Sequence, residues 1–435
     1  MVSGSVKIYS AEDSARLRYI AGIILGDILG LSWSVITDKR KLGKNPVINY
    51  SADSIAGSFK INPETLLFEK GICQKQIVIS AWKGLPVFFQ TSAGSDLPFD
   101  IFAASFFLVS RYEEYFEAEH DDYGRFCASS SIAVKNGFLE RPVVDLWAKE
   151  LAKAFLNKFP NLVFRRNEYK SLLTIDTDQP FAYLGKNLFR SIGSFFGEKN
   201  RIQSTVGNRY RIITKEEKDP FDVFDYVIEN IERSNVEAKF FFPVGNRSKY
   251  DNNPSWRNEE YRKLIHKIAA KYQIGLHPSF VAGGDGSLIA TEASRLKLIL
   301  GKEINFCRFH FIRLFTPNSY NNVIKAGISE DYSMGYPDEP GFRAGIARPY
   351  FFYNVIDDQL TNLRIIPFQV MDVTLYDYKK LDPIDSKEII LRLINETRKV
   401  GGLFVSIWHN TSLLNNEEWN MWREVFEFMI KNQLP

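Results

Sequence analysis

From about Asn167 to the end of the chain, apolar runs of strand length alternate with segments of helical periodicity. The runs 171–175, 238–245 and 403–408 are predicted as strands, and 386–399 has the pattern of a helix. This alternation is typical of βα units, whose crossovers keep successive strands parallel. The sequence therefore predicts an α/β fold with a mostly parallel sheet, open or closed into a barrel. In such folds the chemistry lies at the carboxyl ends of the strands.

The part of the chain before this alternation has a mixed pattern. Short strand-like runs occur at 33–36 and 47–50, and helical patterns follow later in the same part. The length of 435 residues also exceeds the usual size of a single domain. We therefore predict a smaller N-terminal α+β accessory domain over 1–166 and a second domain over 167–435.

Composition excludes several classes of protein. The net charge of +3 is small for this length and indicates no nucleic-acid partner. The three cysteines form no CxxC pair, so a reducing compartment is favoured. The most apolar segment, 19–31, is too short to span a bilayer and contains Asp27, and the first residues lack a secretion-signal pattern. We predict a cytoplasmic protein without a transmembrane segment. The sequence does not indicate its oligomeric state.

Two acidic residues, Asp176 and Asp178, stand at the end of the strand predicted at 171–175. Residues i and i+2 of a strand point to the same side, so both carboxylates are expected in one site. Two adjacent anions repel each other unless a cation joins them or one of them keeps its proton. The pair therefore suits one metal ligand beside one general base.

Three of the five histidines, His277, His310 and His409, also follow predicted strands. Strand ends of an α/β fold converge on one cleft, so these imidazoles and the two aspartates are predicted to form one site. An aspartate with histidines suits Zn²⁺ or a similar divalent ion. His266 lies inside a predicted helix and is left out of the site. His120 lies in an acidic stretch that is better explained as a solvated loop.

These residues resemble, in their order, the motifs of the polysaccharide deacetylase (NodB-homology) family. The segment Thr174-Ile175-Asp176-Thr177-Asp178 is similar to the family's opening motif with two acids one residue apart. The other similar elements are Ile274-Gly275-Leu276-His277, Cys307-Arg308-Phe309-His310-Phe311, Gly327-Ile328-Ser329-Glu330-Asp331-Tyr332-Ser333 and Val405-Ser406-Ile407-Trp408-His409. The set covers about 169 to the C-terminus. The part before it resembles the companion domain of a Bacteroidetes-type branch of the family. The fold implied for 167–435 is a NodB-like distorted (β/α) barrel.

The resemblance implies a metal-dependent hydrolase that removes acetyl groups from a carbohydrate, by N- or O-deacetylation. Its partner would be an acetylated sugar or a polysaccharide precursor. An amidase that cleaves a C–N bond outside a sugar would use the same chemistry. By the family match, Asp178 and His277 bind the metal, Asp176 is the base and His409 is the acid.

Two further roles are implied by the same match. Arg308 would keep Asp176 in its charged form, and Asp331 would orient His409 and stabilise its positive charge.

The sequence departs from the family at one metal ligand. A second histidine normally stands four residues after the first, and Val281 occupies that position here. Our hypothesis is that His310 replaces it, which gives the set Asp178, His277 and His310 for Zn²⁺, or for Co²⁺, Ni²⁺ or Fe²⁺. The alternative is a catalytically degenerate protein that binds glycans or protein partners in surface-polysaccharide synthesis.

Substrate contacts are predicted from the loop at 332–345 and its surroundings. Arg343 and Arg348 could bind an acidic sugar, although structural ion pairs explain surface arginines equally well. The predicted substrate-binding residues are Arg343, Arg348, Tyr336 and Trp408. In the loop 246–256, Tyr250 and Trp256 are predicted places for sugar stacking.

Overall fold

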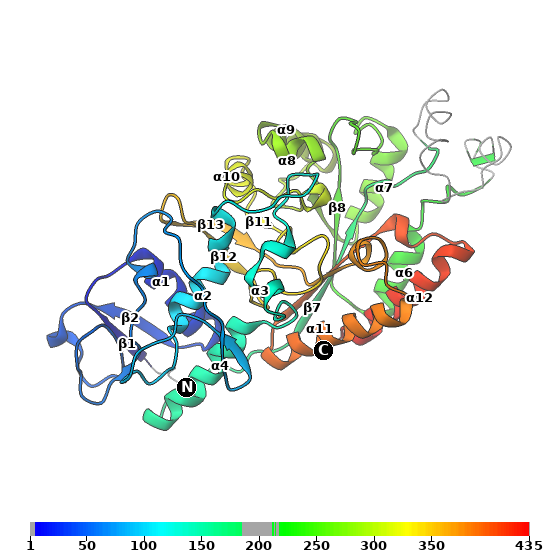
Figure 1. The fold of residues 1–435 in the computed structure, drawn as a ribbon. Helices are drawn as coiled ribbons and strands as arrows, with labels where there is room; N and C mark the ends of the chain where they lie inside the picture. Colours follow the sequence, from blue (N-terminus) through cyan, green and yellow to red (C-terminus); the bar gives the residue numbers. More distant parts are fainter. Residues whose placement is uncertain (1–4, 185–210, 213, 215–216, 435) are drawn as a thin grey trace.

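The computed structural model describes residues 5–184, 211–212, 214 and 217–434 (Figure 1). The protein is a mixed α/β structure in which two predominantly parallel sheets lie in successive parts of the chain. We call the residues up to about 166 the first part and the residues after them the second part. In Figure 1 the first part is drawn in blue and cyan and lies to one side of the larger second part.

The first sheet has the strand order β2-β1-β3-β4, and all of its pairs are parallel. Its strands are β1 (Ser5–Ser10), β2 (Ser32–Ile36), β3 (Val47–Tyr50) and β4 (Phe59–Lys60). The apolar segment 19–31 lies mostly within helix α1 (Ala15–Ala21) and the π-helix that continues it to Ile28. The Ser14 hydroxyl accepts a hydrogen bond from the Leu17 amide and so caps the first turn. This segment is thus a mostly buried helix.

The remaining elements of the first part connect its sheet to the second. They are the hairpin β5 (Ser80–Trp82) and β6 (Leu85–Val87) and the helices α2 (Ile101–Val109), α3 (Ile132–Lys135) and α4 (Val143–Lys158). Asp100 caps α2 through hydrogen bonds from two backbone amides. The sequence pattern over 100–116 predicts one helix, but α2 ends at Val109, because Arg111 adopts a left-handed conformation with φ 55°.

The second sheet has nine strands among the described residues, in the order β12-β13-β11-β10-β9-β8-β7-β15-β14. Only the pair β12–β13 is antiparallel. The strands are β7 (Lys170–Asp176), β8 (Ala238–Phe242), β9 (Gln273–Leu276), β10 (Phe306–Cys307), β11 (Glu330–Asp331), β12 (Tyr350–Asn354), β13 (Gln359–Ile365), β14 (Val370–Met371) and β15 (Leu403–His409). The helices are α6 (Phe224–Ser234), α7 (Glu259–Ala269), α8 (Phe280–Gly284), α9 (Ser287–Leu300), α10 (Asn318–Lys325), α11 (Pro383–Val400) and α12 (Glu417–Asn432).

The helices cover the outside of this sheet. In α7, for example, Tyr261, Leu264, Ile265 and Ile268 are buried at the spacing of one helix face, and Asn258 caps the first turn. Along β8, alternate side chains enter two different apolar clusters, because neighbouring residues of a strand point to opposite faces.

The smaller of these clusters lies inside a curled sheet. It collects side chains from strands across the sheet and from the segment after β13: Leu172, Phe241, Phe306, Ile312, Tyr332, Ile366, Phe368, Met371, Val405 and Ile407. Strands far apart in the order can share one cluster only if the sheet bends around it. Among the described residues, no hydrogen-bonded strand pair joins β14 to β12. The predicted distorted barrel is therefore open between these two strands.

The two parts of the chain share one continuous apolar core, which contains residues of both sheets. Buried ion pairs also join them. Arg343 of the second part donates two hydrogen bonds to Glu114 of the first, each 2.8 Å long. Arg348 pairs with the fully buried Asp145 at 2.5 Å. The domain boundary between 166 and 167 stays a prediction.

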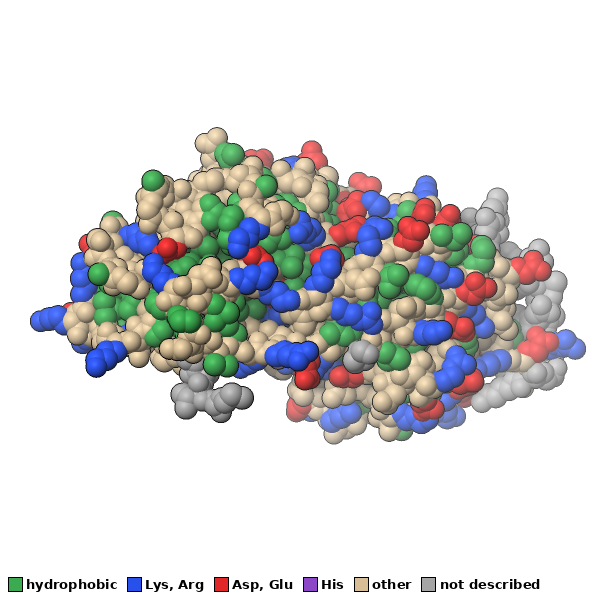
Figure 2. Space-filling view, turned by 90° about the horizontal axis from the view of Figure 1, so that it is seen from below, with side chains coloured by type: hydrophobic (Ala, Val, Ile, Leu, Met, Phe, Trp, Pro, Cys, Tyr) green, Lys and Arg blue, Asp and Glu red, His purple; other side chains and the backbone are tan. Residues whose placement is uncertain are grey.

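The surface carries charges of both signs. Figure 2 shows lysine and arginine side chains along the face seen from below, with acidic side chains interspersed. Within the described ranges, no helix has both the length and the apolar composition needed to cross a membrane.

The Glu114 ion pairs lead to a prediction about stability. The Glu114 carboxylate also accepts a hydrogen bond from Arg111, at 2.7 Å, and its side chain is 3% exposed. Burial alone would raise the pKa of Glu114, but Arg343 and Arg111 outweigh it and lower the pKa to about 2. Glu114→Gln leaves the buried Arg343 without its anion and leaves Arg111 with Glu113 alone, so the free energy of unfolding should fall by about 3–5 kcal/mol. Chemical denaturation measures this loss.

Glu140→Gln is the matched control. Glu140 also pairs with an arginine across the two parts, Arg392, but both side chains are well exposed. Its loss should cost less than about 1 kcal/mol. Equal losses in the two variants would contradict the role assigned to the buried cluster.

Candidate metal and acid–base site

The register of the second sheet brings the predicted residues together. Asp176 at the end of β7 pairs with His409 at the end of β15. Leu276 of β9 pairs with Cys307 of β10, so the residues that follow them, His277 and Arg308, lie side by side. Thr177 anchors the chain after β7, because its amide and its hydroxyl both donate to the Phe241 carbonyl. These contacts hold the start of the loop after β7 in place.

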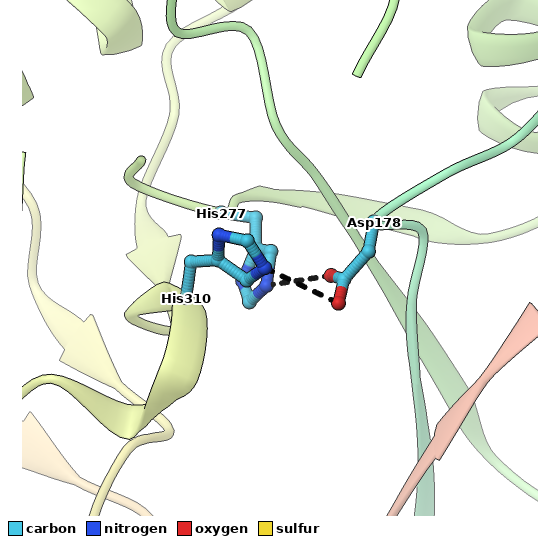
Figure 3. A group of neighbouring side chains, drawn as sticks. All are labelled: Asp178, His277 and His310. Atoms are coloured by element: carbon cyan, nitrogen blue, oxygen red, sulfur yellow. Dashed lines mark ion pairs between the residues drawn. The ribbon is translucent and has the colours of Figure 1, made fainter. Parts of the chain in front are cut away.

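Asp178, His277 and His310 form one group whose ligand atoms all lie within 4.8 Å of one another (Figure 3). His277 Nε2 lies 3.0 Å from one oxygen of Asp178, and His310 Nε2 lies 3.3 Å from the other. Figure 3 shows the two imidazoles and the carboxylate pointing toward a common centre. One carboxylate with two imidazole nitrogens is a donor set that could hold a divalent metal ion.

Each imidazole is fixed through its other ring nitrogen. Nδ1 of His277 lies 2.6 Å from the Arg308 carbonyl oxygen, which can only accept a hydrogen bond, so Nδ1 donates. Nδ1 of His310 lies 2.9 Å from Asp251 Oδ1. Metal-binding histidines usually donate their second N–H in this way, which leaves Nε2 free to bind a metal. Sequence reasoning missed Asp251, which lies in the loop predicted for sugar stacking.

Two buried atoms of this group have no hydrogen-bond partner among the described residues. They are His277 Nε2 and Asp178 Oδ1, which face each other. Buried polar atoms are normally satisfied, so an unpaired carboxylate oxygen opposite an unpaired imidazole nitrogen fits a bound cation. The site residues therefore fit a metal ion by their donor set and by these two atoms.

The carboxylates and imidazoles shift one another's pKa. Burial alone would raise the pKa of Asp178, but the positive charges of His310 and His409 outweigh it and hold the pKa well below its ordinary value. Burial alone would lower the pKa of His310, but Asp178 and Asp251 outweigh it and raise the pKa to about 9. A protonated imidazole cannot bind a metal, so a metal must displace this proton, and its affinity falls as the pH falls.

Asp176 and Arg308 form a buried pair, as the sequence predicts. Arg308 Nη1 donates to Asp176 Oδ1 at 2.9 Å, and its Nε donates to the Tyr332 carbonyl. The guanidinium lies over the Phe241 ring, 4.4 Å from its centroid, and the residue is fully buried. Asp176 Oδ2, in contrast, lies 3.9 Å from Nε2 of both His277 and His409. This oxygen faces the candidate metal ligand His277 and the candidate acid His409, and Arg308 binds the other oxygen.

The structure corrects the residue assigned to orient His409. Asp372, which follows β14, lies 2.7 Å from His409 Nδ1 and also accepts a hydrogen bond from the His409 amide. Asp331 instead accepts hydrogen bonds from the amide and hydroxyl of Ser333, which hold the turn after β11, and contacts the Cys307 thiol of β10. The prediction for Asp331 was wrong. Strand β14, which precedes Asp372, pairs with β15, which carries His409, whereas β11, which carries Asp331, lies several strands away from β15.

Burial alone would lower the pKa of His409, but Asp372 and Asp178 outweigh it and raise the pKa to about 10. Its Nε2 lies 3.7 Å from Asp178 Oδ2. An imidazolium held by one carboxylate, with its other N–H directed at the site, is placed to donate a proton.

The predicted substrate-binding residues are corrected as well. Arg343 and Arg348 make ion pairs with Glu114 and Asp145 in the interior. Tyr336 is buried beside Arg343, and its hydroxyl accepts from Arg111. Trp408 points away from His409, because neighbouring residues of a strand face opposite sides, and it packs on Phe426 and Met429. All four residues therefore support the fold: Arg343, Arg348, Tyr336 and Trp408.

The turn after His310 has a strained backbone. Phe311 and Ile312 adopt φ angles of 60° and 52°, a left-handed conformation that costs a side-chain-bearing residue roughly 1–2 kcal/mol. Beside the turn, the rings of Tyr250, Phe280 and Phe311 pack on one another and are partly exposed.

Tyr250 therefore lies near the site, as the stacking prediction requires. Trp256 lies between Arg257 and Arg295 instead. Of the two remaining histidines, His266 is exposed on α7 and His120 is exposed in its loop.

Comparison with known proteins gives two kinds of match. A family model described as "Family of unknown function (DUF7033)" matches residues 6–160. No curated protein matches the chain.

Among solved structures, the chain is similar to a proposed polysaccharide deacetylase from Mycobacterium smegmatis, with 15% identity, coverage of 61% of this chain and 86% of that one, and a TM-score of 0.40. It is also similar to the polysaccharide deacetylase Bc1974 from Bacillus cereus, with 11% identity, coverage of 61% and 87%, and a TM-score of 0.31. For the 4-alpha-glucanotransferase from Thermococcus litoralis, the identity is 13%, the coverage 61% and 37%, and the TM-score 0.35. Similarities this low establish no activity for the chain.

The place of His310 in the metal group gives a second prediction. His310→Ala removes one of the three ligand atoms, so a metal that the wild type binds with one ion per chain should be largely absent from this variant after dialysis. Elemental analysis of the purified proteins measures this. His266→Ala, which changes an exposed histidine, is the control and should retain the metal. Unchanged stoichiometry in His310→Ala would remove this residue from the ligand set.

Proposed function

We propose that this protein is a metal-dependent hydrolase that removes acetyl groups from a carbohydrate. The observation that carries the proposal is the convergence of three histidine Nε2 atoms on two neighbouring aspartates: His277 and His310 on Asp178, and His409 between Asp176 and Asp178. Such a group joins a candidate metal site to a candidate acid–base pair, the combination that metal-assisted hydrolysis of an amide or ester uses.

Asp178, His277 and His310 would hold the metal. Bound there, a divalent ion would polarise the acyl carbonyl and lower the pKa of a water molecule. Zn²⁺ suits the donor set best, and Co²⁺, Ni²⁺ or Fe²⁺ would also suit it.

Asp176 would act as the general base. Its Oδ1 accepts a hydrogen bond from Arg308, while Oδ2 faces the imidazoles at 3.9 Å. A carboxylate with one oxygen held and the other directed into the site can accept a proton from an attacking water.

His409 would act as the general acid. Asp372 fixes Nδ1, so the proton that can be transferred is the one on Nε2. The raised pKa keeps this imidazole protonated at neutral pH, ready to donate to the departing amine or alkoxide. The orientation of the His409 ring is therefore set by its contact with Asp372.

A cytoplasmic location is also part of this proposal. A degenerate protein would need neither a base nor an acid. Here Asp176 and His409 are each held by a buried partner, Arg308 and Asp372, as a base and an acid would be. The arrangement therefore favours catalysis over binding alone.

A direct test is acetate release from a panel of N- and O-acetylated sugars by the metal-loaded protein. Asp176→Asn and His409→Gln should retain the metal but lose roughly 100-fold or more in kcat, the usual contribution of a general base or acid. His120→Gln, in the exposed loop, is the control and should be fully active. Metal binding without hydrolysis of any acetylated substrate would contradict the proposal and favour the binding function.

A further inference from the structure

One loop of the first part, 119–126, lies against the turn that follows His310. Two arginines join the segments in both directions. Arg125 Nη1 donates to the Phe311 carbonyl at 2.7 Å, and Arg313 Nε donates to the Tyr123 carbonyl at 3.0 Å. In Figure 1 the coil before α3 extends over the second part of the chain toward α8.

The guanidinium of Arg125 is held on several sides. Asp121 Oδ2 accepts from its Nε at 2.7 Å, and its Nη2 donates to the Tyr378 hydroxyl at 3.0 Å. The other oxygen of Asp121 accepts from the amides of Tyr123 and Arg125, so one carboxylate folds the loop and aims the arginine. Arg125 is 4% exposed. A donor fixed in this way can in turn fix the carbonyl that it binds.

Tyr123 adds a packing contact at the same place. Its ring lies 5.1 Å from the Phe311 ring and 5.6 Å from the Tyr250 ring, measured between centroids. The loop of the first part thus contacts both the backbone and the side chain of Phe311, the residue next to the candidate metal ligand His310.

We propose that the loop 119–126 completes the candidate metal site, with Arg125 as a positioning residue that holds the turn carrying His310. Left-handed residues with side chains persist only where the surrounding contacts determine their conformation. Phe311 and Ile312 are such residues, and the hydrogen bond from Arg125 acts on the peptide that joins them. When this bond is lost, the turn relaxes and His310 Nε2 moves away from Asp178.

This inference rests on the metal site of the proposed function and assigns a role to the part of the chain that matches a family of unknown function. It predicts that a residue outside the second sheet controls metal affinity. Arg125 does not contact any of the three ligand side chains directly; it reaches them through the Phe311 peptide.

The test measures Zn²⁺ affinity of the full-length protein by competition with a chromophoric chelator. Arg125→Met should raise the Kd for Zn²⁺ by roughly tenfold, the lower end of the loss seen when residues that orient metal ligands are changed. Arg125→Lys, which keeps the charge and one donor, should fall between that variant and the wild type. Arg392→Met breaks a different contact between the two parts, the ion pair with Glu140, and should leave the Kd unchanged.

Circular dichroism and thermal unfolding accompany each measurement. A role in stability alone would lower the midpoint of unfolding in Arg125→Met without changing the Kd, and a Kd within about twofold of the wild type would overturn the inference. If Arg125→Met does not fold, the Kd of Arg125→Lys is used instead, and a value within about twofold of the wild type would overturn the inference. A wild type that binds no Zn²⁺ overturns this inference together with the proposed function. If the wild type binds Zn²⁺ and hydrolyses acetyl groups but Arg125→Met binds Zn²⁺ with unchanged affinity, only this inference is overturned and the proposed function stands.

Discussion

The repulsion between two neighbouring carboxylates is the constraint on which the site depends. Asp176 ends strand β7 and Asp178 follows in the next loop, and the two carboxylates face the same imidazoles. Asp176 is buried, whereas the Asp178 side chain is 23% exposed. Anions placed this closely need compensating positive charge. The chain compensates them in different ways. Asp176 receives a permanent cation, Arg308, whereas Asp178 faces Nε2 of His277 and of His310, two nitrogens that could bind a metal. This difference separates the candidate base from the candidate metal ligand.

The supporting residues follow from the same constraint. An imidazole can interact with Asp178 only if its Nε2 points toward the carboxylate. A hydrogen-bond partner for Nδ1 fixes the ring in that orientation. The Arg308 carbonyl, Asp251 and Asp372 supply these partners for the three histidines. Each comes from a different loop at the carboxyl end of the sheet, so the register of the strands and the shape of the loops together determine the orientation of the rings.

The sequence predicts the part of this site that depends on strand ends. Asp176, Asp178 and the histidines were identified because they follow apolar runs, and the parallel register brings them together. Asp372 carries the same signal, since it follows Val370 and Met371, yet a strand of two residues is too short to recognise by its pattern.

Contacts between distant segments could not be predicted in this way. The sequence identifies Arg343 and Arg348 as charged loop residues, but their burial depends on the fold of the first part, which supplies Glu114 and Asp145. The interaction of Arg125 with the Phe311 carbonyl joins residues 186 positions apart. A backbone carbonyl leaves no signature in the sequence, so only the structure reveals that interaction.

The most direct test of the central claim is the anomalous scattering of crystals grown with Zn²⁺, measured on both sides of the zinc absorption edge. The account predicts one strong peak between the Asp178 carboxylate and Nε2 of His277 and His310, at about 2.0–2.2 Å from each ligand atom. A peak held by other residues, or crystals with no peak at this position, would contradict the claim that these three side chains form a metal site.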